Sequence, residues 1–170
     1  MILAFGEHYP VIHDPVFVAP GSYVIGRVEI QKESSIWFNA VVRADGDDVH
    51  IGERTNLQDL VTVHADPGAP VRIGDRVTIG HGAIIHGATI ASEVLVGMGS
   101  IIMNGATVES HAIVAAGTLV PESMIVPSGS LVMGRPARVI REVRLEEVEA
   151  LLRQADSYLF RWVEQGWHFH

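Results

Sequence analysis

Aliphatic residues recur along this chain at intervals of six positions, from Val18 to Val132. Three extra residues interrupt the series before Ile51 and four before Ile73, and the interval before Ile90 is one residue shorter than six. All 19 members are Val, Ile or Leu, although these types make up only 49 of the 170 residues. The members are Val18, Val24, Ile30, Ile36, Val42, Ile51, Leu57, Val63, Ile73, Ile79, Ile85, Ile90, Val96, Ile102, Val108, Val114, Val120, Val126 and Val132.

A period of six fits neither a helix nor a long alternating strand, and it predicts short strands separated by sharp turns. Three such strands close a triangular coil of about 18 residues, and successive coils stack about 4.8 Å apart. The fourth residue after each aliphatic is usually small or β-branched, as this turn geometry requires. Examples are Ser34, Ala40, Thr55, Val77, Ala83, Thr89, Ser100, Ala106, Ala112, Thr118 and Ser130.

The pattern resembles the hexapeptide-repeat family over residues 18–136. That resemblance implies a mainly β fold, a left-handed parallel β-helix, with the handedness coming from the resemblance alone. The alternative is an aliphatic-rich β-sandwich in which the spacing is accidental.

The pattern changes after Gly134-Arg135-Pro136. Apolar residues then follow helical spacing, which predicts a C-terminal helix over residues 142–164 that covers a prism face or a neighbouring subunit. Residues 1–17 are expected to lead into the first coil and cap it, so residues 1–170 form a single domain. The helical stripe consists of Val148, Leu151, Leu152, Ala155, Leu159 and Val163.

The charge balance narrows the possible partners. With 12 Lys and Arg against 20 Asp and Glu, the formal net charge of −8 disfavours nucleic acid and anionic membranes. The absence of cysteine excludes disulfides, thiol catalysis and cysteine-bound metal. No stretch has the length of a membrane span and no signal peptide is evident, so we expect a cytoplasmic protein.

A solenoid converts sequence spacing into position, which allows the histidines to be placed. His64 and His86 each follow a member of the aliphatic series, and their separation of 22 equals one coil plus the four-residue insertion. If the insertion loops out near Asp66, the two imidazoles lie one coil apart and can share a metal ion. By the same reasoning Arg43 lies one coil below His64.

His81 belongs to a different column. It lies near a corner of the prism, five extended residues (about 16 Å) before His86, and Asp59 lies one coil below it. Within one chain His81 cannot reach a metal ion shared by His64 and His86. The spacing therefore predicts an intersubunit site in a homotrimer.

The remaining histidines are interpreted as solvated turn residues. For His168 and His170, packing or fraying of the tail is favoured over a metal-binding role. These residues are His8, His13, His50, His111, His168 and His170.

A set of motifs resembles the gamma-class carbonic anhydrases. The resemblance implies that His64, His81 and His86 bind Zn²⁺, with Fe²⁺ or Co²⁺ as alternatives. It also implies that Arg43 and Asp45 pair at the trimer interface. The motifs are Val41-Val42-Arg43-Ala44-Asp45, Ile51-Gly52-Glu53-Arg54-Thr55-Asn56-Leu57-Gln58-Asp59, His64, Ile79-Gly80-His81 and His86-Gly87-Ala88-Thr89-Ile90.

The same resemblance implies further roles. Asn56 and Gln58 would orient solvent on the metal, Asp59 would support the interface, and Tyr158 would reach a neighbour's pocket. The implied activity is reversible hydration of carbon dioxide by metal-bound hydroxide, since a cation with three neutral imidazole ligands and an open position acidifies water.

Two departures from the family pattern affect proton removal. The glutamate that follows the family's Arg-x-Asp motif is replaced by Gly46, and the acidic loop after the first histidine is reduced to residues 65–70, with Asp66 as its one carboxylate. We therefore expect slow hydration that depends on external buffer. We also expect a glutamate at position 46 or in the 66–69 loop to lessen that dependence.

Three alternatives stay open at this point. The first is metal-dependent hydrolysis of acyl-CoA thioesters, and the second is CoA-dependent acyl transfer, which needs one basic histidine instead of a metal set. The third is a non-catalytic metal-binding scaffold. The spacing of the ligands does not distinguish zinc, cobalt and ferrous iron.

Overall fold

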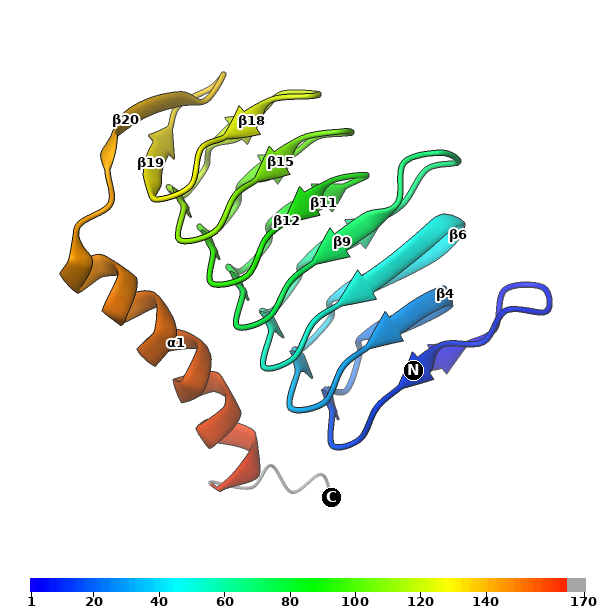
Figure 1. Ribbon diagram of the computed structural model, residues 1–170. Helices are drawn as coiled ribbons and strands as arrows, with labels where there is room; N and C mark the ends of the chain where they lie inside the picture. The colour runs from blue at the N-terminus through cyan, green and yellow to red at the C-terminus, as the bar shows by residue number, and fades with distance from the viewer. Residues whose placement is uncertain (165–170) are drawn as a thin grey trace.

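The computed structural model describes residues 1–164. They form a parallel β-solenoid of stacked triangular coils, with one helix lying along its side (Figure 1). The six-residue period thus predicted the fold class correctly. His168 and His170 lie outside the described residues.

Each coil contributes short strands to three faces, and β4 (Tyr23–Ile30) and β6 (Val41–Ile51) continue from the first face around a corner onto the second. The first face also contains β1 (Ile2–Leu3), β8 (Thr62–His64), β11 (Ile84–His86), β14 (Ile101–Ile102) and β17 (Leu119–Val120). The second face also contains β2 (Val11–Ile12), β9 (Val71–Ile73), β12 (Thr89–Ile90), β15 (Thr107–Val108) and β18 (Ile125–Val126). The third face contains β3 (Phe17–Val18), β5 (Ser35–Ile36), β7 (Asn56–Leu57), β10 (Thr78–Ile79), β13 (Leu95–Val96), β16 (Ile113–Val114), β19 (Ser130–Met133) and β20 (Arg138–Glu142).

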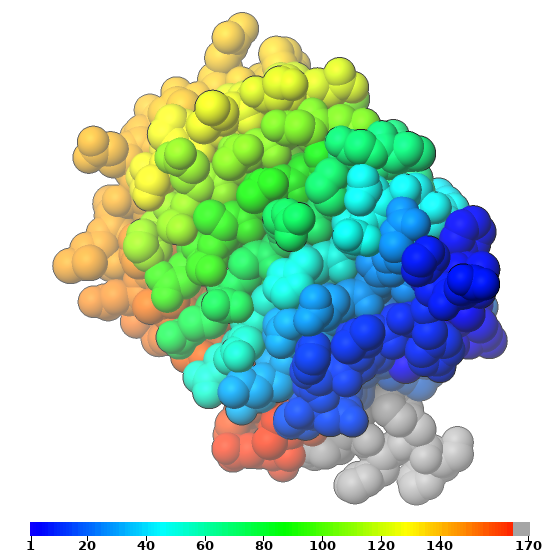
Figure 2. Space-filling view, turned by 45° about the vertical axis from the view of Figure 1, so that its right-hand side comes forward, coloured from blue at the N-terminus to red at the C-terminus, as the bar shows by residue number. Residues whose placement is uncertain are grey.

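The breaks in the six-residue series do not disturb the stacking of the coils. Val42 pairs with Val63 and His64 pairs with His86, so the register crosses both insertions. The first insertion is taken up within β6 around Gly46, where the β4–β6 register shifts, and the second forms a turn closed by the Ala69 N–H donating to the Asp66 carbonyl. The coils consequently form parallel bands across the surface (Figure 2).

The aliphatic series forms the core of the solenoid. Eighteen of its 19 members are buried, and Val18 is partly buried against them in the first coil. In the coil with the short step, Ala88 is buried and the companion residue Thr89 is exposed.

The C-terminal helix α1 spans Leu145–Val163 and begins three residues later than predicted. Residues 138–142 instead form β20, which pairs antiparallel with β19 at the end of the solenoid. The Glu147 carboxylate accepts a hydrogen bond from the Arg144 backbone N–H, which stabilises the start of the helix after this strand. Hydrogen bonds from Arg141 and then Arg144 hold the pKa of Glu147 far below its usual range. Within residues 1–164 no helix is long and apolar enough to cross a membrane.

Helix α1 runs beside the third face of its own chain and ends near the first coils (Figure 1). Its buried residues are Leu151, Ala155 and Tyr158, whereas Val163, predicted on the apolar stripe, is 53% exposed. The buried face is rotated towards Tyr158 because aromatic side chains of the first coils cover that side. The Tyr158 ring meets Trp37 edge-to-face with centroids 5.3 Å apart.

Truncation of a core aliphatic tests the assignment of the core. Ile102 is fully buried, so Ile102→Ala is expected to lower the free energy of unfolding by about 2–5 kcal/mol through the cavity it leaves. Ile125→Ala is the matched control, because that side chain is 63% exposed and its loss is expected to change stability little. Chemical denaturation measures both, and equal losses would contradict the assignment.

Candidate metal centre

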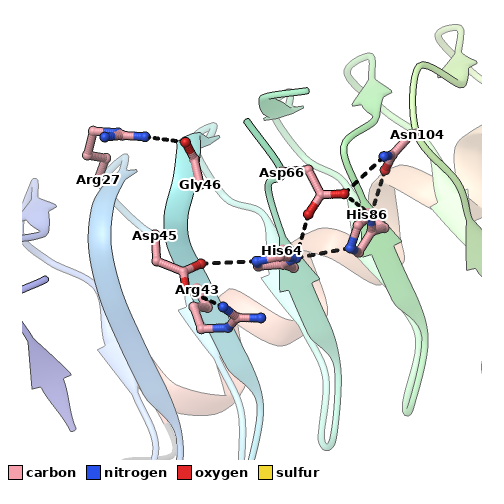
Figure 3. A network of polar contacts seen from close by, with 8 residues as sticks. All are labelled: Arg27, Arg43, Asp45, Gly46, His64, Asp66, His86 and Asn104. Atoms are coloured by element: carbon pink, nitrogen blue, oxygen red, sulfur yellow. Dashed lines mark hydrogen bonds and ion pairs between the residues drawn. The ribbon is translucent and has the colours of Figure 1, made fainter. Parts of the chain in front are cut away.

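His64 and His86 face each other at the corner between the first and second faces (Figure 3). They pair directly in the β8–β11 ladder, and His64 Nδ1 lies 3.0 Å from His86 Nε2. Arg43 pairs with His64 in the β6–β8 ladder. The column predicted from the spacing, Arg43, His64 and His86, is therefore present in the structure.

Asp45 fixes the outer side of the His64 ring. Its Oδ1 atom lies 3.0 Å from His64 Nε2, and its Oδ2 atom accepts a hydrogen bond from Arg43. Burial opposes ionisation of Asp45, but the hydrogen bonds from Arg43 and His64 outweigh it and lower the pKa of the carboxyl. An ionised carboxylate only accepts hydrogen bonds, so His64 Nε2 carries the hydrogen in the neutral ring and Nδ1 presents its lone pair to His86.

Asp66 lies beside the two histidines and forms with them a group of three potential ligands. Potential ligand atoms of His64, Asp66 and His86 all lie within 4.8 Å of one another, and this is the one such group of three or more in residues 1–164. The Asp66 Oδ1 atom lies 3.6 Å from His64 Nδ1. Two imidazoles and a carboxylate are donors suited to zinc and similar divalent ions, and the lone pair of His64 Nδ1 faces the other two groups. These residues therefore fit a metal ion.

His81 lies at the other end of the first face, before β11 begins, and does not belong to this group. Its Nδ1 atom lies 3.1 Å from Asp59 Oδ2, and its backbone N–H donates to Gln58 Oε1 at 3.2 Å. The predicted separation of His81 and Asp59 from the His64 column is therefore observed within one chain.

Asn56, Gln58 and Tyr158 lie at the His81 end. Gln58 is 3% exposed and donates from Nε2 to Asn56 Oδ1 at 3.4 Å. Burial raises the pKa of the Tyr158 hydroxyl, and the Asp59 carboxylate adds to this effect against the opposing charge of Arg161. A cavity of about 360 Å³ lies between Tyr158 and His81, and it is lined by Trp37, Phe38, Asp59, His81, Tyr158 and Arg161.

One chain thus carries two separate groups of predicted site residues. The first group is Arg43, Asp45, His64, Asp66 and His86, and the second is Asn56, Gln58, Asp59, His81 and Tyr158. Asn104, which contacts His86 and Asp66, was missed in the sequence analysis. The position of Asn104, two residues after Ile102, was a signal that placed it in the turn stacked on Gly87, but spacing does not indicate its side-chain contacts.

Three of the other histidines contact surface carboxylates. His13 and His50 lie 3.0 and 3.4 Å from the two oxygens of Glu29, and His111 lies 2.6 Å from Glu93. The hydrogen bond from His13, followed by the interactions with His50, lowers the pKa of Glu29 despite partial burial. His13, His50 and His111 are thus solvated as predicted, but His50 lies within strand β6 and not in a turn.

The absence of a side chain at Gly46 has a steric cause. A Cβ atom there would lie 2.3 Å from the Ala65 carbonyl oxygen and 2.9 Å from Pro67 Cδ. The short loop of residues 65–70 packs on this glycine, and Arg27 donates to the Gly46 carbonyl at 2.6 Å. A glutamate at position 46, which we expect to lessen the buffer dependence, must therefore displace this loop to be accommodated.

Comparisons with known proteins agree with the fold, which is that of a hexapeptide-repeat protein with a left-handed β-helix. The chain is 52% identical over 149 residues to a protein of Methanocaldococcus jannaschii named "probable carbonic anhydrase", covering 88% of this chain and 94% of the relative. It is 42% identical to gamma carbonic anhydrase 2 of Arabidopsis thaliana mitochondria, covering 88% of this chain but only 56% of the plant protein. The chain belongs to the gamma carbonic anhydrase family.

A solved structure supports the same fold. A hexapeptide transferase family protein from Anaplasma phagocytophilum superposes with a TM-score of 0.90 at 38% identity, covering 94% of each chain. No family model matches the chain.

A substitution at Gly46 tests the packing of the loop. Gly46→Glu is expected to lower the free energy of unfolding by about 1–3 kcal/mol, because residues 65–67 must move to admit the side chain. Asp48→Glu on the same strand is the control, since its side chain is 66% exposed. Thermal or chemical denaturation compares the two, and a Gly46→Glu protein as stable as the wild type would refute the steric explanation.

Proposed function

We propose that this protein is a metal-dependent lyase that interconverts carbon dioxide and bicarbonate. The observation that carries this proposal is the arrangement of His64 and His86, whose facing nitrogens lie 3.0 Å apart beside Asp66, with Asp45 directing the His64 lone pair inward. Membership of the gamma carbonic anhydrase family supports the same reaction. Zn²⁺ is the proposed cofactor, with Fe²⁺ or Co²⁺ as alternatives for the same donors.

The proposed active unit is a homotrimer. His64 and His86 lie at one end of the first face and His81 at the other, so a third imidazole for the same ion comes from a neighbouring chain. Such contacts between different patches close into a ring when each subunit is rotated by a third of a turn. Arg43, paired with Asp45 and 43% exposed, is placed to contact that neighbour.

A divalent ion held by these residues acidifies water and so supplies a nucleophile at neutral pH. Asp59 engages His81 Nδ1 and thereby leaves Nε2 for ligation. Gln58 holds the backbone of His81, and its second amide hydrogen is available to orient solvent or substrate. Asp66, 42% exposed at its side chain, is the carboxylate placed to pass a proton from the site to buffer.

Thioester hydrolysis is a second candidate, favoured by a specific observation. A cleft of about 350 Å³ lies between helix α1 and the third face, with an apolar lining and with Gln58 and His81 at its edge. A cleft of this kind suits an acyl chain better than it suits carbon dioxide alone. Side chains that line it include Leu95, Met98, Ile113, Ala115, Gln154 and Tyr158.

The proposed assembly predicts a trimer that binds three metal ions. Light scattering combined with metal analysis of anaerobically purified protein measures both numbers. Arg43→Ala is expected to weaken assembly while the coils stay folded, because the aliphatic core is untouched. Arg72→Ala, an exposed arginine on the second face, is the matched control. A metal-loaded monomeric wild type would refute the proposed assembly.

The proposed reaction predicts slow hydration of carbon dioxide that rises with buffer concentration. Asp66 is the one carboxylate in the loop of residues 65–70, so external buffer must accept most protons. Stopped-flow assays of the metal-loaded protein over a series of imidazole-type buffer concentrations test this expectation. Asp66→Asn is expected to steepen the dependence.

Parallel assays with acyl-CoA substrates separate the candidate reactions. Hydration absent at every buffer concentration, together with acyl-CoA hydrolysis, would replace the lyase with the thioesterase. Turnover of an acyl-CoA only with an acceptor and without metal would favour acyl transfer. Absence of all three activities in metal-loaded protein would favour a scaffold role. Fast, buffer-independent hydration would contradict the role given to Asp66.

A further inference from the structure

Asn104 touches both His86 and Asp66 from the next coil. It lies in the turn after β14, with its Oδ1 atom 2.5 Å from His86 Nδ1 and its Nδ2 atom donating to Asp66 Oδ2 at 3.2 Å (Figure 3). Asn104 is therefore the residue that links the second imidazole of the site to its carboxylate.

The hydrogen-bonding capacity of these groups determines where the imidazole proton lies. The Asp66 carboxylate has only acceptor atoms, so the NH₂ end of the Asn104 amide must face it. The amide oxygen then faces His86, and since this oxygen also only accepts, His86 Nδ1 must be the donor. The lone pair of the neutral His86 ring is consequently on Nε2.

This placement matters because His86 Nε2 is the atom that faces His64. Asp45 leaves the lone pair of His64 on Nδ1, and the two nitrogens are 3.0 Å apart. With both rings neutral and in these tautomers, two lone pairs point at each other, and a cation between them would relieve this repulsion. Asn104 does for His86 what Asp45 does for His64.

The chain leaves room for this contact by having glycine at position 87. A Cβ atom on Gly87 would lie 2.6 Å from Asn104 Oδ1, and residue 87 adopts a positive φ of 55°. Gly87 is stacked below Asn104, because Ile85 pairs with Ile102 one coil above. Any larger residue at position 87 would push the amide away from His86.

We propose that Asn104 is a positioning residue that fixes His86 in its Nδ1–H tautomer, so that Nε2 is presented to a divalent metal ion. The metal-related part of this inference rests on the proposed function, whereas the tautomer does not. Contacts from outside the ligand set commonly change metal affinity about 10- to 100-fold.

The tautomer is measured first, on metal-free wild-type protein. Long-range ¹H–¹⁵N correlation spectra of the imidazoles, at a pH where His86 is neutral, are expected to show His86 protonated at Nδ1. A ring protonated at Nε2 would overturn the proposal. The Nδ1–H tautomer in a protein that binds no zinc would support the role of Asn104 and would overturn the metal-dependent function instead.

Three variants then test the role of Asn104. Asn104→Leu is expected to lose the fixed tautomer and to bind Zn²⁺ about 10- to 100-fold more weakly in competition with a chelator. Asn104→Asp keeps an acceptor for Nδ1–H, so it is expected to keep the tautomer and to bind zinc more tightly than the leucine variant. Glu122→Gln, which changes a charge in the same cavity, is the control and is expected to match the wild type.

Two results with these variants would contradict the proposal. An Asn104→Leu protein with the wild-type tautomer and zinc affinity would overturn it. So would equal losses in the leucine and aspartate variants with an unchanged His86 spectrum, because that result would indicate a structural effect alone.

Discussion

Main-chain hydrogen bonding between successive coils is the constraint on which the rest of this structure depends. Each strand from β1 to β19 pairs in parallel with its equivalent one coil away, so side chains far apart in sequence are stacked in columns at intervals of about 4.8 Å. The insertions around Gly46 and in residues 65–70 are accommodated at one corner of the solenoid and do not change this pairing. The corner therefore acquires a polar column, and the core beneath it stays aliphatic.

Each histidine of the proposed site has an acceptor beside one ring nitrogen. Asp45 serves His64 and Asp59 serves His81, through neighbours fixed by the stacking of coils. Because a neutral imidazole has one donor and one acceptor nitrogen, these contacts decide which atom is left for a ligand. The chemistry of the site is thus determined by residues that are not themselves the ligands.

The periodicity of the sequence was sufficient to predict the coils, the core and the placement of His64 over Arg43, because all of these depend on counting residues. It failed where a local contact decides the outcome. The short step before Ile90 leaves Thr89 exposed and buries Ala88 in its place, which a count of six residues does not indicate. The extra strand before helix α1 has no six-residue signature, and Asn104 was missed because its role depends on where a flexible amide points.

The position of the histidines along the solenoid has a consequence for local unfolding. In a stack of coils each unit is stabilised mainly by its immediate neighbours, so the end coils open more readily than those between them. Strands β8 and β11, which hold His64 and His86, have two or more paired strands on either side of them in the first face. Fraying that starts at either end must therefore melt several coils before it reaches these histidines, and the site keeps its geometry through partial openings of the molecule.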